Sequence, residues 1–182
     1  FKIYKDSVLN IEEGNSVSIK KDGQNVFFGF IFTFKIDKEG FYNITAYDQL
    51  RYFKNKDTYY YVNKKANEML KELAVMFNLN VGTLDDTEYI IPKRLEEDKT
   101  LFDMVQNALD FTLQNKKKIY VLYDDFGKLT LKNIENMKLN ILIDEETAEN
   151  YSYTSSIDSN TYNQIKLTFD NEDTGKRDVY MS

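Results

Sequence analysis

The chain has 182 residues, of which 42% are hydrophobic and 30% charged, and its formal net charge is −6. This length allows one domain with a substantial core or two small domains. The acidic balance disfavours non-specific nucleic-acid binding, because that binding depends on cations that neutralise phosphates. The absence of Cys and His excludes thiol nucleophiles, Ser-His-Asp triads and structural zinc sites from these residues.

The first fifty residues carry the signals of β-structure. The sequence contains 14 Tyr and 13 Phe, and aromatic residues favour strands. The patterns predict strands at 17–20, 26–36 and 41–47, with a turn at 21–24. Gly29 interrupts the long middle run, and we expect it to mark a bulge or a sharp bend.

Two amphipathic helices follow. The first is predicted from an apolar stripe at helical spacing, formed by Ala66, Met69, Leu70, Leu73 and Phe77. Asn63 is its predicted N-cap. The second helix begins after Thr100, which forms a capping-box-like start with Asp103. Its stripe comprises Leu101, Met104, Val105, Ala108, Leu109 and Thr112. Pro92 is predicted to lie in an extended linker between the helices.

The last third of the chain is predicted to return to β-structure. A hairpin is expected from 118–123 and 128–132 around the turn at 124–127. Leu139, Ile141 and Ile143 alternate as in a strand, and an acidic turn or short helix is expected from 144 to 150. Further strands are expected near 151–155, 164–169 and 177–181.

This order of elements predicts an α+β fold. We expect a β-barrel-like domain built from N-terminal strands in 1–51 and C-terminal strands in 136–182. A helix–helix–hairpin α+β subdomain, 52–135, is inserted between them. The chain begins with Phe1 in what reads as the middle of a domain, so we expect it to be a piece of a longer protein.

Paired carboxylates are the first candidates for chemistry. They occur at Asp85-Asp86, Glu96-Glu97, Asp124-Asp125 and 144–146. A glycosidase needs two carboxyl groups that face each other across a sugar, which adjacent residues do not provide. We therefore expect these pairs to lie in solvated turns, where Asp and Glu are common. The segment 170–175 lacks the spacing of a calcium loop and is predicted to be a hairpin turn. The sequence predicts no catalytic residue, no metal ligand and no cofactor-binding residue.

Two further runs have structural interpretations. Tyr59, Tyr60 and Tyr61 are predicted to alternate in a strand leading into the first helix, as core or interface residues. A sugar or base platform is the alternative for these rings. The lysines at 116–118 follow the second helix, where cations interact well with the helix dipole.

Several stretches, in order, resemble the XkdQ/YqbQ-like tail proteins of Gram-positive prophages. They are GNSV at 14–17, VFFGF at 26–30, AYDQLRYFK at 46–54, DKTLFDM at 98–104, YDDFGKL at 123–129 and the segment 155–180. The resemblance implies a baseplate hub of contractile phage tails and tailocins, which is trimeric in the intact protein. Such a protein joins the tail tube to the spike and baseplate. Members of the family are sometimes labelled hydrolases, but no catalytic residue is carried over to this chain, and we expect it not to be an enzyme.

The same resemblance implies the partners and the location. The partners would be further copies and other tube, spike and baseplate proteins, without specific nucleic-acid binding and without a membrane. The protein would be assembled in the bacterial cytoplasm into the virion tail. The acidic charge would suit a lumen through which DNA passes, because such a surface does not bind phosphate.

Two other functions stay open from the sequence. A peptidoglycan hydrolase of the tail tip would need one of Asp85 or Asp86 opposed to Glu96 or Glu97 across a cleft. A cell-wall carbohydrate-binding module would use the three tyrosines at 59–61. The hub, in contrast, requires exposed apolar strand edges or patches.

Overall fold

The computed structural model describes residues 1–4, 6, 8–144, 152–155 and 162–181. The chain forms two compact units, Phe1–Leu139 and Asn140–Ser182, which are described separately. Strands and two helices together make an α+β protein, which confirms the predicted fold class.

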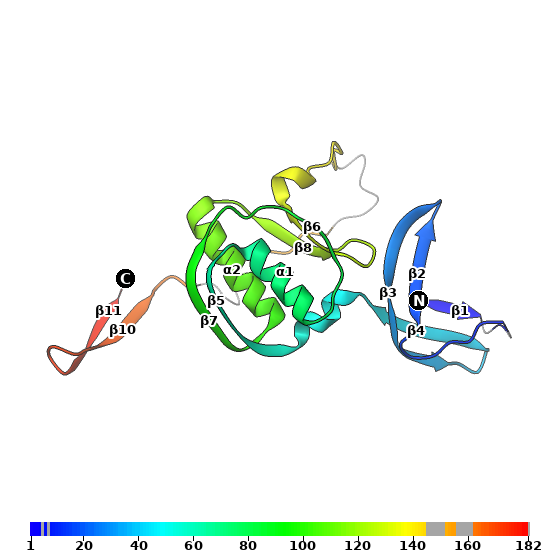
Figure 1. The fold of residues 1–182 in the computed structure, drawn as a ribbon, viewed down its shortest axis with the longest axis horizontal. Coiled ribbons are helices and arrows are strands. Elements are labelled where there is room, and N and C mark those ends of the chain that lie inside the picture. Colours follow the sequence, from blue (N-terminus) through cyan, green and yellow to red (C-terminus); the bar gives the residue numbers. More distant parts are fainter. Residues whose placement is uncertain (5, 7, 145–151, 156–161, 182) are drawn as a thin grey trace. The chain divides into compact units, whose positions relative to one another are not determined.

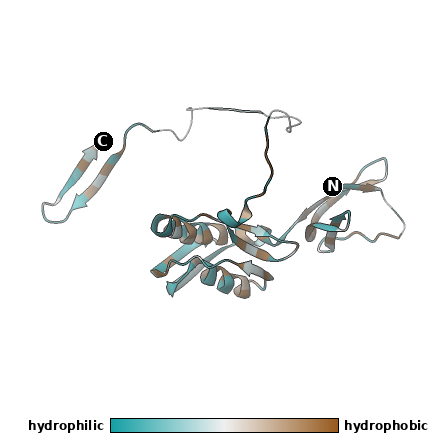
Figure 2. Ribbon diagram, turned by 90° about the horizontal axis from the view of Figure 1, so that it is seen from above, coloured by the Kyte–Doolittle hydropathy of each residue, from teal (hydrophilic) through white to brown (hydrophobic). Residues whose placement is uncertain are grey.

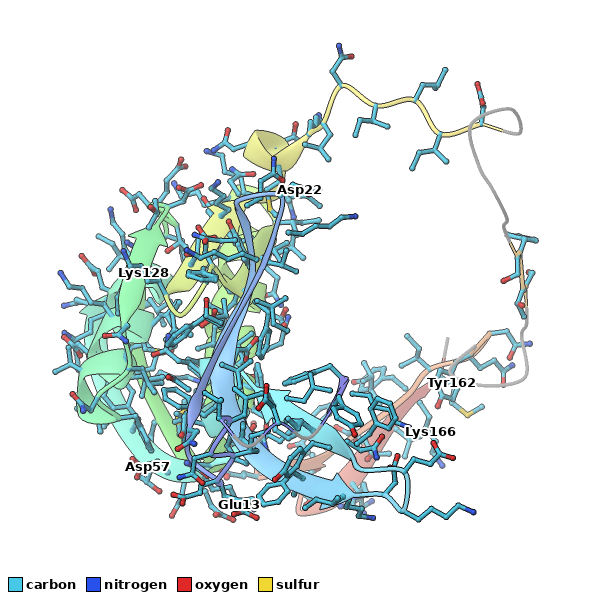
Figure 3. The ribbon with its side chains drawn as sticks, turned by 90° about the vertical axis from the view of Figure 1, so that its right-hand side faces the viewer. Glu13, Asp22, Asp57, Lys128, Tyr162 and Lys166 are labelled. Atoms are coloured by element: carbon cyan, nitrogen blue, oxygen red, sulfur yellow. The ribbon has the colours of Figure 1, made fainter. Side chains whose placement is uncertain are left out.

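The first unit opens with a four-stranded antiparallel sheet in the order β1-β4-β3-β2, here called the N-terminal sheet. Its strands are β1 (Lys2–Tyr4), β2 (Ser16–Lys21), β3 (Gln24–Ile36) and β4 (Phe41–Tyr47). β2 and β3 form a hairpin, with Asp22 at its tip (Figure 3). Asp22 and Gly23 have φ of 51° and 78°, as the tight turns of hairpins require. The predicted strands 17–20, 26–36 and 41–47 are thereby confirmed.

The bulge predicted at Gly29 is wrong. The register of β3 is irregular between Ile31 and Thr33 against β4, whereas Gly29 pairs regularly with Val17 of β2. A Cβ atom on Gly29 would overlap the carbonyl oxygen of Tyr47. Glycine is therefore required here by a close approach of two backbones.

Two helices and a long strand pair form the body of the first unit. Its elements are η1 (Gln49–Lys54), β5 (Lys56–Lys64), α1 (Ala66–Met76), β7 (Ile91–Thr100) and α2 (Leu101–Lys116). β5 and β7 form an antiparallel ribbon that curves around the two helices (Figure 1). The predicted apolar stripes are buried between ribbon and helices, with Met69, Leu70, Leu73, Leu101 and Met104 fully inaccessible.

One predicted helix cap is confirmed and the other is wrong. Thr100 caps α2, and its hydroxyl oxygen accepts a hydrogen bond from the Asp103 N–H at 3.1 Å. Asn63 instead lies inside β5 with a φ of 50°, and Lys65 is the N-cap of α1. The carboxylate of Glu68, the third residue of α1, accepts a hydrogen bond from the Lys65 N–H at 2.9 Å. This bond satisfies the backbone N–H group of the N-cap residue.

The extended linker predicted around Pro92 is also wrong. Pro92 belongs to β7, which pairs with β5 from Lys56–Thr100 to Lys64–Ile91. The strand is rich in charge because only one of its faces packs against the helices. Apart from Pro92, only Ile91 and Leu95 of its ten residues are apolar, so the strand carried little hydrophobic signal.

A three-stranded sheet completes the first unit in the order β6-β9-β8. It comprises β6 (Val81–Leu84), β8 (Tyr120–Asp124) and β9 (Leu129–Asn133), and η2 (Ile134–Met137) follows. β8 and β9 are the predicted hairpin, while β6 adds a parallel strand. Leu129 and Leu131 of β9 are fully buried in the core of the body.

The second unit contains the hairpin of β10 (Lys166–Asn171) and β11 (Lys176–Met181), which confirms the two last predicted strands. The Asn171 side chain accepts from the N–H groups of Asp173 and Thr174, as expected of the predicted turn. Hydrophilic and hydrophobic residues alternate along β10, whereas β11 begins with three charged residues (Figure 2).

The other predictions for the C-terminal part of the chain are not confirmed. The strand predicted from Leu139, Ile141 and Ile143 is wrong, since these exposed residues have no strand conformation. No strand is present at 152–155, and the acidic turn at 145–150 lies outside the described residues. A common barrel of 1–51 and 136–182 stays a prediction.

Candidate interaction surface

One face of the N-terminal sheet is a small apolar core that is open at one end. Ile31, Tyr42 and Ile44 are buried on it, and Ile3, Ile11, Val17 and Phe34 pack against them. Beside this cluster lies an open pocket of about 330 Å³, lined by Phe1, Ile19, Phe27, Ile44, Thr45 and Ala46. The sheet therefore presents uncovered apolar side chains at this end.

Both outer strands of the N-terminal sheet are edges. In the part of the chain that the structure describes, β1 pairs only with β4, and β2 pairs only with β3. Each edge strand leaves backbone N–H and C=O groups on one side that a further strand can pair with. The N-terminal sheet thus has two unpaired strand edges among the described residues, and the exposed positions of β2 are serines and lysines.

The opposite face of the sheet carries a row of six aromatic rings, here called the aromatic ladder. Its members, in spatial order, are Phe126, Phe28, Phe30, Tyr47, Phe32 and Tyr52. Ring centroids lie 5.7 Å apart for Phe126 and Phe28, 5.8 Å for Phe28 and Phe30, 5.1 Å for Tyr47 and Phe32, and 6.4 Å for Phe32 and Tyr52. The two groups of three rings are joined by the cross-strand pairing of Phe30 with Tyr47. Such edge-on and tilted contacts stabilise aromatic pairs beyond their buried area.

Cations lie at both ends of the aromatic ladder. The Lys20 ammonium is 5.9 Å from the Phe126 ring. The Arg51 guanidinium is 5.8 Å from the Phe32 ring and 5.7 Å from the Tyr47 ring. Tyr47 is 44% exposed and Tyr52 is 37% exposed, so the Arg51 end of the ladder faces solvent.

The buried side chain of Gln49 fixes the ladder against the body. Its amide nitrogen donates to the Gly127 carbonyl at 2.6 Å, and its oxygen accepts from the Asn80 N–H at 2.6 Å. A Cβ atom on Gly127 would lie only 2.6 Å from the Phe28 ring, so the turn that carries Phe126 is closely seated. Burial raises the pKa of Asp48 beside this contact, and the Asp124 carboxylate acts in the same direction.

A second pocket adjoins the Tyr52 end of the ladder. Its volume is about 340 Å³, and its lining residues are Phe30, Gln49, Tyr52, Phe77, Asn78, Leu79 and Asn80. Phe30 and Tyr52 therefore belong both to the ladder and to this pocket. The remaining wall is the segment that ends α1.

The predicted carboxylate pairs have structural partners. The solvated-turn prediction is wrong for Glu96, which lies in β7 and is 1% exposed. Its two oxygens accept from Arg94 Nε at 2.8 Å and from Asn107 Nδ2 at 2.9 Å. Asp86 forms a surface ion pair with Lys65, while Asp85 accepts from the Asn133 N–H at 2.9 Å. Neither pocket beside the N-terminal sheet is lined by these carboxylates.

The tyrosine run alternates as predicted. Tyr59 and Tyr61 are buried and stacked at 5.6 Å, whereas Tyr60 is 55% exposed. Burial raises the pKa of Tyr61 to about 12, and burial together with the hydrogen bond to Glu72 raises the pKa of Tyr59. The three rings consequently do not form one exposed platform.

The described residues hold neither a metal-binding cluster nor a membrane-spanning helix. No group of three or more acidic side chains there is arranged to hold a metal ion. None of their helices combines the length and the apolar character of a membrane span. In the lysine run, Lys117 ends α2 with a φ of 58°, and Lys118 forms an ion pair with Glu88.

The fold is shared with a phage tail protein of known structure. The crystal structure of the 43 kDa tail protein of prophage MuSo2 from Shewanella oneidensis is similar over 72% of this chain and 42% of that chain. The TM-score is 0.55 and the sequence identity is 14%, so this similarity concerns the fold.

The sequence itself gives the family. Residues 1–182 match the YQBQ-like family. The "Uncharacterized protein YqbQ" of Bacillus subtilis (strain 168) is 32% identical over 164 residues, which are 88% of this chain and 50% of that protein. The "Phage-like element PBSX protein XkdQ" of the same organism is 30% identical over 125 residues, 68% of this chain and 38% of that protein. The chain belongs to the YQBQ-like family, which confirms the resemblance seen in its sequence, and it spans half or less of these relatives.

Proposed function

We propose that this chain is a structural component of a contractile phage or tailocin tail. In this role it is part of a baseplate hub that joins the tail tube to the spike and baseplate by self-association, and it is not an enzyme. Family membership supports the proposal, as do a relative named for a phage-like element and a similar fold in a prophage tail protein.

The observation that carries the proposal is the N-terminal sheet. It has two open edges and an apolar face with an open pocket at Phe27 and Ala46. Proteins that act alone in solution seldom leave such edges and faces uncovered. Strand addition or face packing by a neighbouring subunit satisfies both features at once.

We extend this proposal to the arrangement of the domains, the number of copies and the binding partners. The segments 1–51 and 136–182 form a common barrel, and three copies of the intact protein form a ring. Other tube, spike and baseplate proteins bind that ring in the virion tail, after assembly in the bacterial cytoplasm. The net charge of −6 keeps the lumen from retaining DNA. An assembled ring with its acidic residues only on the outer face would contradict this last point.

Light scattering on the full-length protein tests self-association. We expect a trimer, and we expect Ile19→Asp, which places a charge in the open pocket, to shift the protein towards monomer. Lys21→Glu at the exposed end of the same strand is the matched control and should leave the trimer intact. A full-length protein that stays monomeric at all concentrations would refute self-association.

A zymogram on bacterial cell walls tests the absence of enzymatic activity. We expect no clearing by the purified chain. Clearing that disappears in Glu96→Gln but persists in Glu97→Gln would establish a peptidoglycan hydrolase instead. A folded-state check by circular dichroism is needed for both variants, because Glu96 is buried.

A further inference from the structure

We propose that the Arg51 end of the aromatic ladder is a docking site for a protein segment that carries a carboxylate next to a bulky apolar side chain. The apolar side chain enters the pocket between Phe30 and Tyr52, and the carboxylate binds Arg51. This inference rests on the proposed assembly function, because it names the chemistry of one partner.

The pocket provides the apolar half of the site. Its volume of about 340 Å³ is at the lower end of the range for ligand pockets, roughly 300–1,000 Å³, and so suits a single large side chain. Phe30, Phe77 and Leu79 supply apolar walls, and Tyr52 connects the pocket with the ladder. Gln49 is already hydrogen-bonded to the backbone of two loops, which keeps this wall in place.

Arg51 provides the charged half. The chain has three arginines, and the other two form ion pairs, Arg94 with Glu96 and Arg177 with Asp170. In the part of the chain that the structure describes, Arg51 has no carboxylate within ion-pair distance. Its guanidinium is held over two rings, so little freedom is lost when a carboxylate binds its planar fork.

The composition of the site favours a protein partner over other ligands. Tyrosine and arginine are among the residues enriched at energetic centres of protein interfaces. A single-stranded nucleic acid also stacks on aromatic rings, but it requires a groove of cations along its backbone. Here η1 offers only Arg51 and Lys54, on a chain with a net charge of −6. A neutral sugar can accept hydrogen bonds from Arg51 but does not offset its charge.

The test is an NMR titration of the isotope-labelled 182-residue chain. The probe is a capped peptide, Gly-Ser-Phe-Asp-Glu-Ser-Gly, added to several millimolar. We expect shifts of the Arg51 Nε–H signal and of the Tyr52 ring, with weaker binding as sodium chloride increases. Arg51→Gln should weaken binding at least fivefold. Lys54→Gln removes a neighbouring cation that contacts no aromatic ring among the described residues, and it should change binding less than twofold.

Control probes decide between the possible ligands. A peptide with Asn-Gln in place of Asp-Glu, and one with Ala in place of Phe, should each bind at least fivefold more weakly. No shift at Arg51 or Tyr52 would overturn the inference, as would equal binding of the Asn-Gln peptide. Preferential binding of a thymidine oligonucleotide or of chitohexaose would overturn it too.

The two proposals fail separately. If the full-length protein forms a trimer but the peptide does not bind, the docking site is wrong and the assembly function stands. If the peptide binds while the full-length protein is a monomer, self-association is wrong and the partner must be a different protein.

Discussion

The buried ion pair of the body gives the sharpest stability prediction. Glu96 is 1% exposed and accepts hydrogen bonds from Arg94 and Asn107. Removing one partner of a buried pair typically costs 3–5 kcal/mol, because a charge stays buried without compensation. The Arg94 side chain is 39% exposed, so water partly replaces it in a variant. We therefore expect Arg94→Met to lower the free energy of unfolding by about 2–3 kcal/mol.

A double-mutant cycle isolates the interaction. Replacing Glu96 with Gln removes the buried charge but keeps a group that can accept from Asn107. The double variant Arg94→Met/Glu96→Gln should therefore be more stable than Arg94→Met alone, with a coupling energy of about 1–2 kcal/mol. Lys93→Met, one residue away on the exposed face of β7, is the matched control and should change stability by less than about 0.5 kcal/mol.

Urea unfolding followed by circular dichroism measures these values, and the Arg94→Met effect corresponds to a fall in Tm of about 5–10 °C. If Arg94→Met is as stable as Lys93→Met, the buried carboxylate does not depend on its arginine. The reasoning about this ion pair would then be refuted.

Three further predictions concern single residues. In urea unfolding, Tyr61→Phe should leave stability unchanged or raise it by up to about 1 kcal/mol, because its buried hydroxyl has no partner among the described residues. Tyr59→Phe loses a hydrogen bond to the Glu72 carboxylate and should lower stability by about 1 kcal/mol. A Tyr61→Phe variant that is less stable than Tyr59→Phe would contradict this. Gly29→Ala should destabilise the N-terminal sheet by roughly 1–3 kcal/mol, seen as faster amide hydrogen exchange in β3 and β4, since the added methyl group meets the Tyr47 carbonyl. A lysine ammonium and a backbone N–H hold the pKa of Asp37 down from 3.8 to about 2, so its stabilisation is complete above the ordinary pKa and is lost as the pH falls towards 2. An NMR titration of that carboxyl group that finds an ordinary pKa would refute the contact.

The elements predicted correctly are those with a strong local pattern. The apolar stripes of α1 and α2 repeat at helical spacing, and each is long enough to outweigh local ambiguity. The hairpins were predicted from turn residues, as at Asp22-Gly23 and at 124–127. Such signals lie within a few residues of one another, so one sequence is sufficient to recognise them.

The wrong predictions share a physical cause. In each, the structure depends on a neighbouring strand or helix that the local sequence pattern does not reveal. β7 was missed because it pairs with residues as distant as Lys56, the partner of Thr100, and because most of its charged residues face solvent while Glu96 is buried. The alternation of Leu139, Ile141 and Ile143 resembles a strand, but alternation alone does not supply a neighbouring strand to pair with. Glu96 looked like a solvated residue because its burial depends on the packing of β7 on α2, which supplies Asn107, although Arg94 is its near neighbour on the same strand.

The candidate interaction surface was only partly visible in the sequence. The aromatic run of β3 and the AYDQLRYFK segment stood out, but their union into one ladder depends on the β3–β4 register. Phe126 joins that ladder from a turn almost a hundred residues after Phe28. The tyrosines at 59–61 drew attention by their density, yet two of the three are core residues.

Electron cryomicroscopy of tail particles that contain this protein tests the central proposal most directly. The account predicts three copies in a ring at the tip of the tail tube, each with its N-terminal sheet covered by a neighbouring chain or by strands of its own intact protein. Particles that assemble completely without the protein, or a bound copy whose N-terminal sheet stays uncovered, would contradict it.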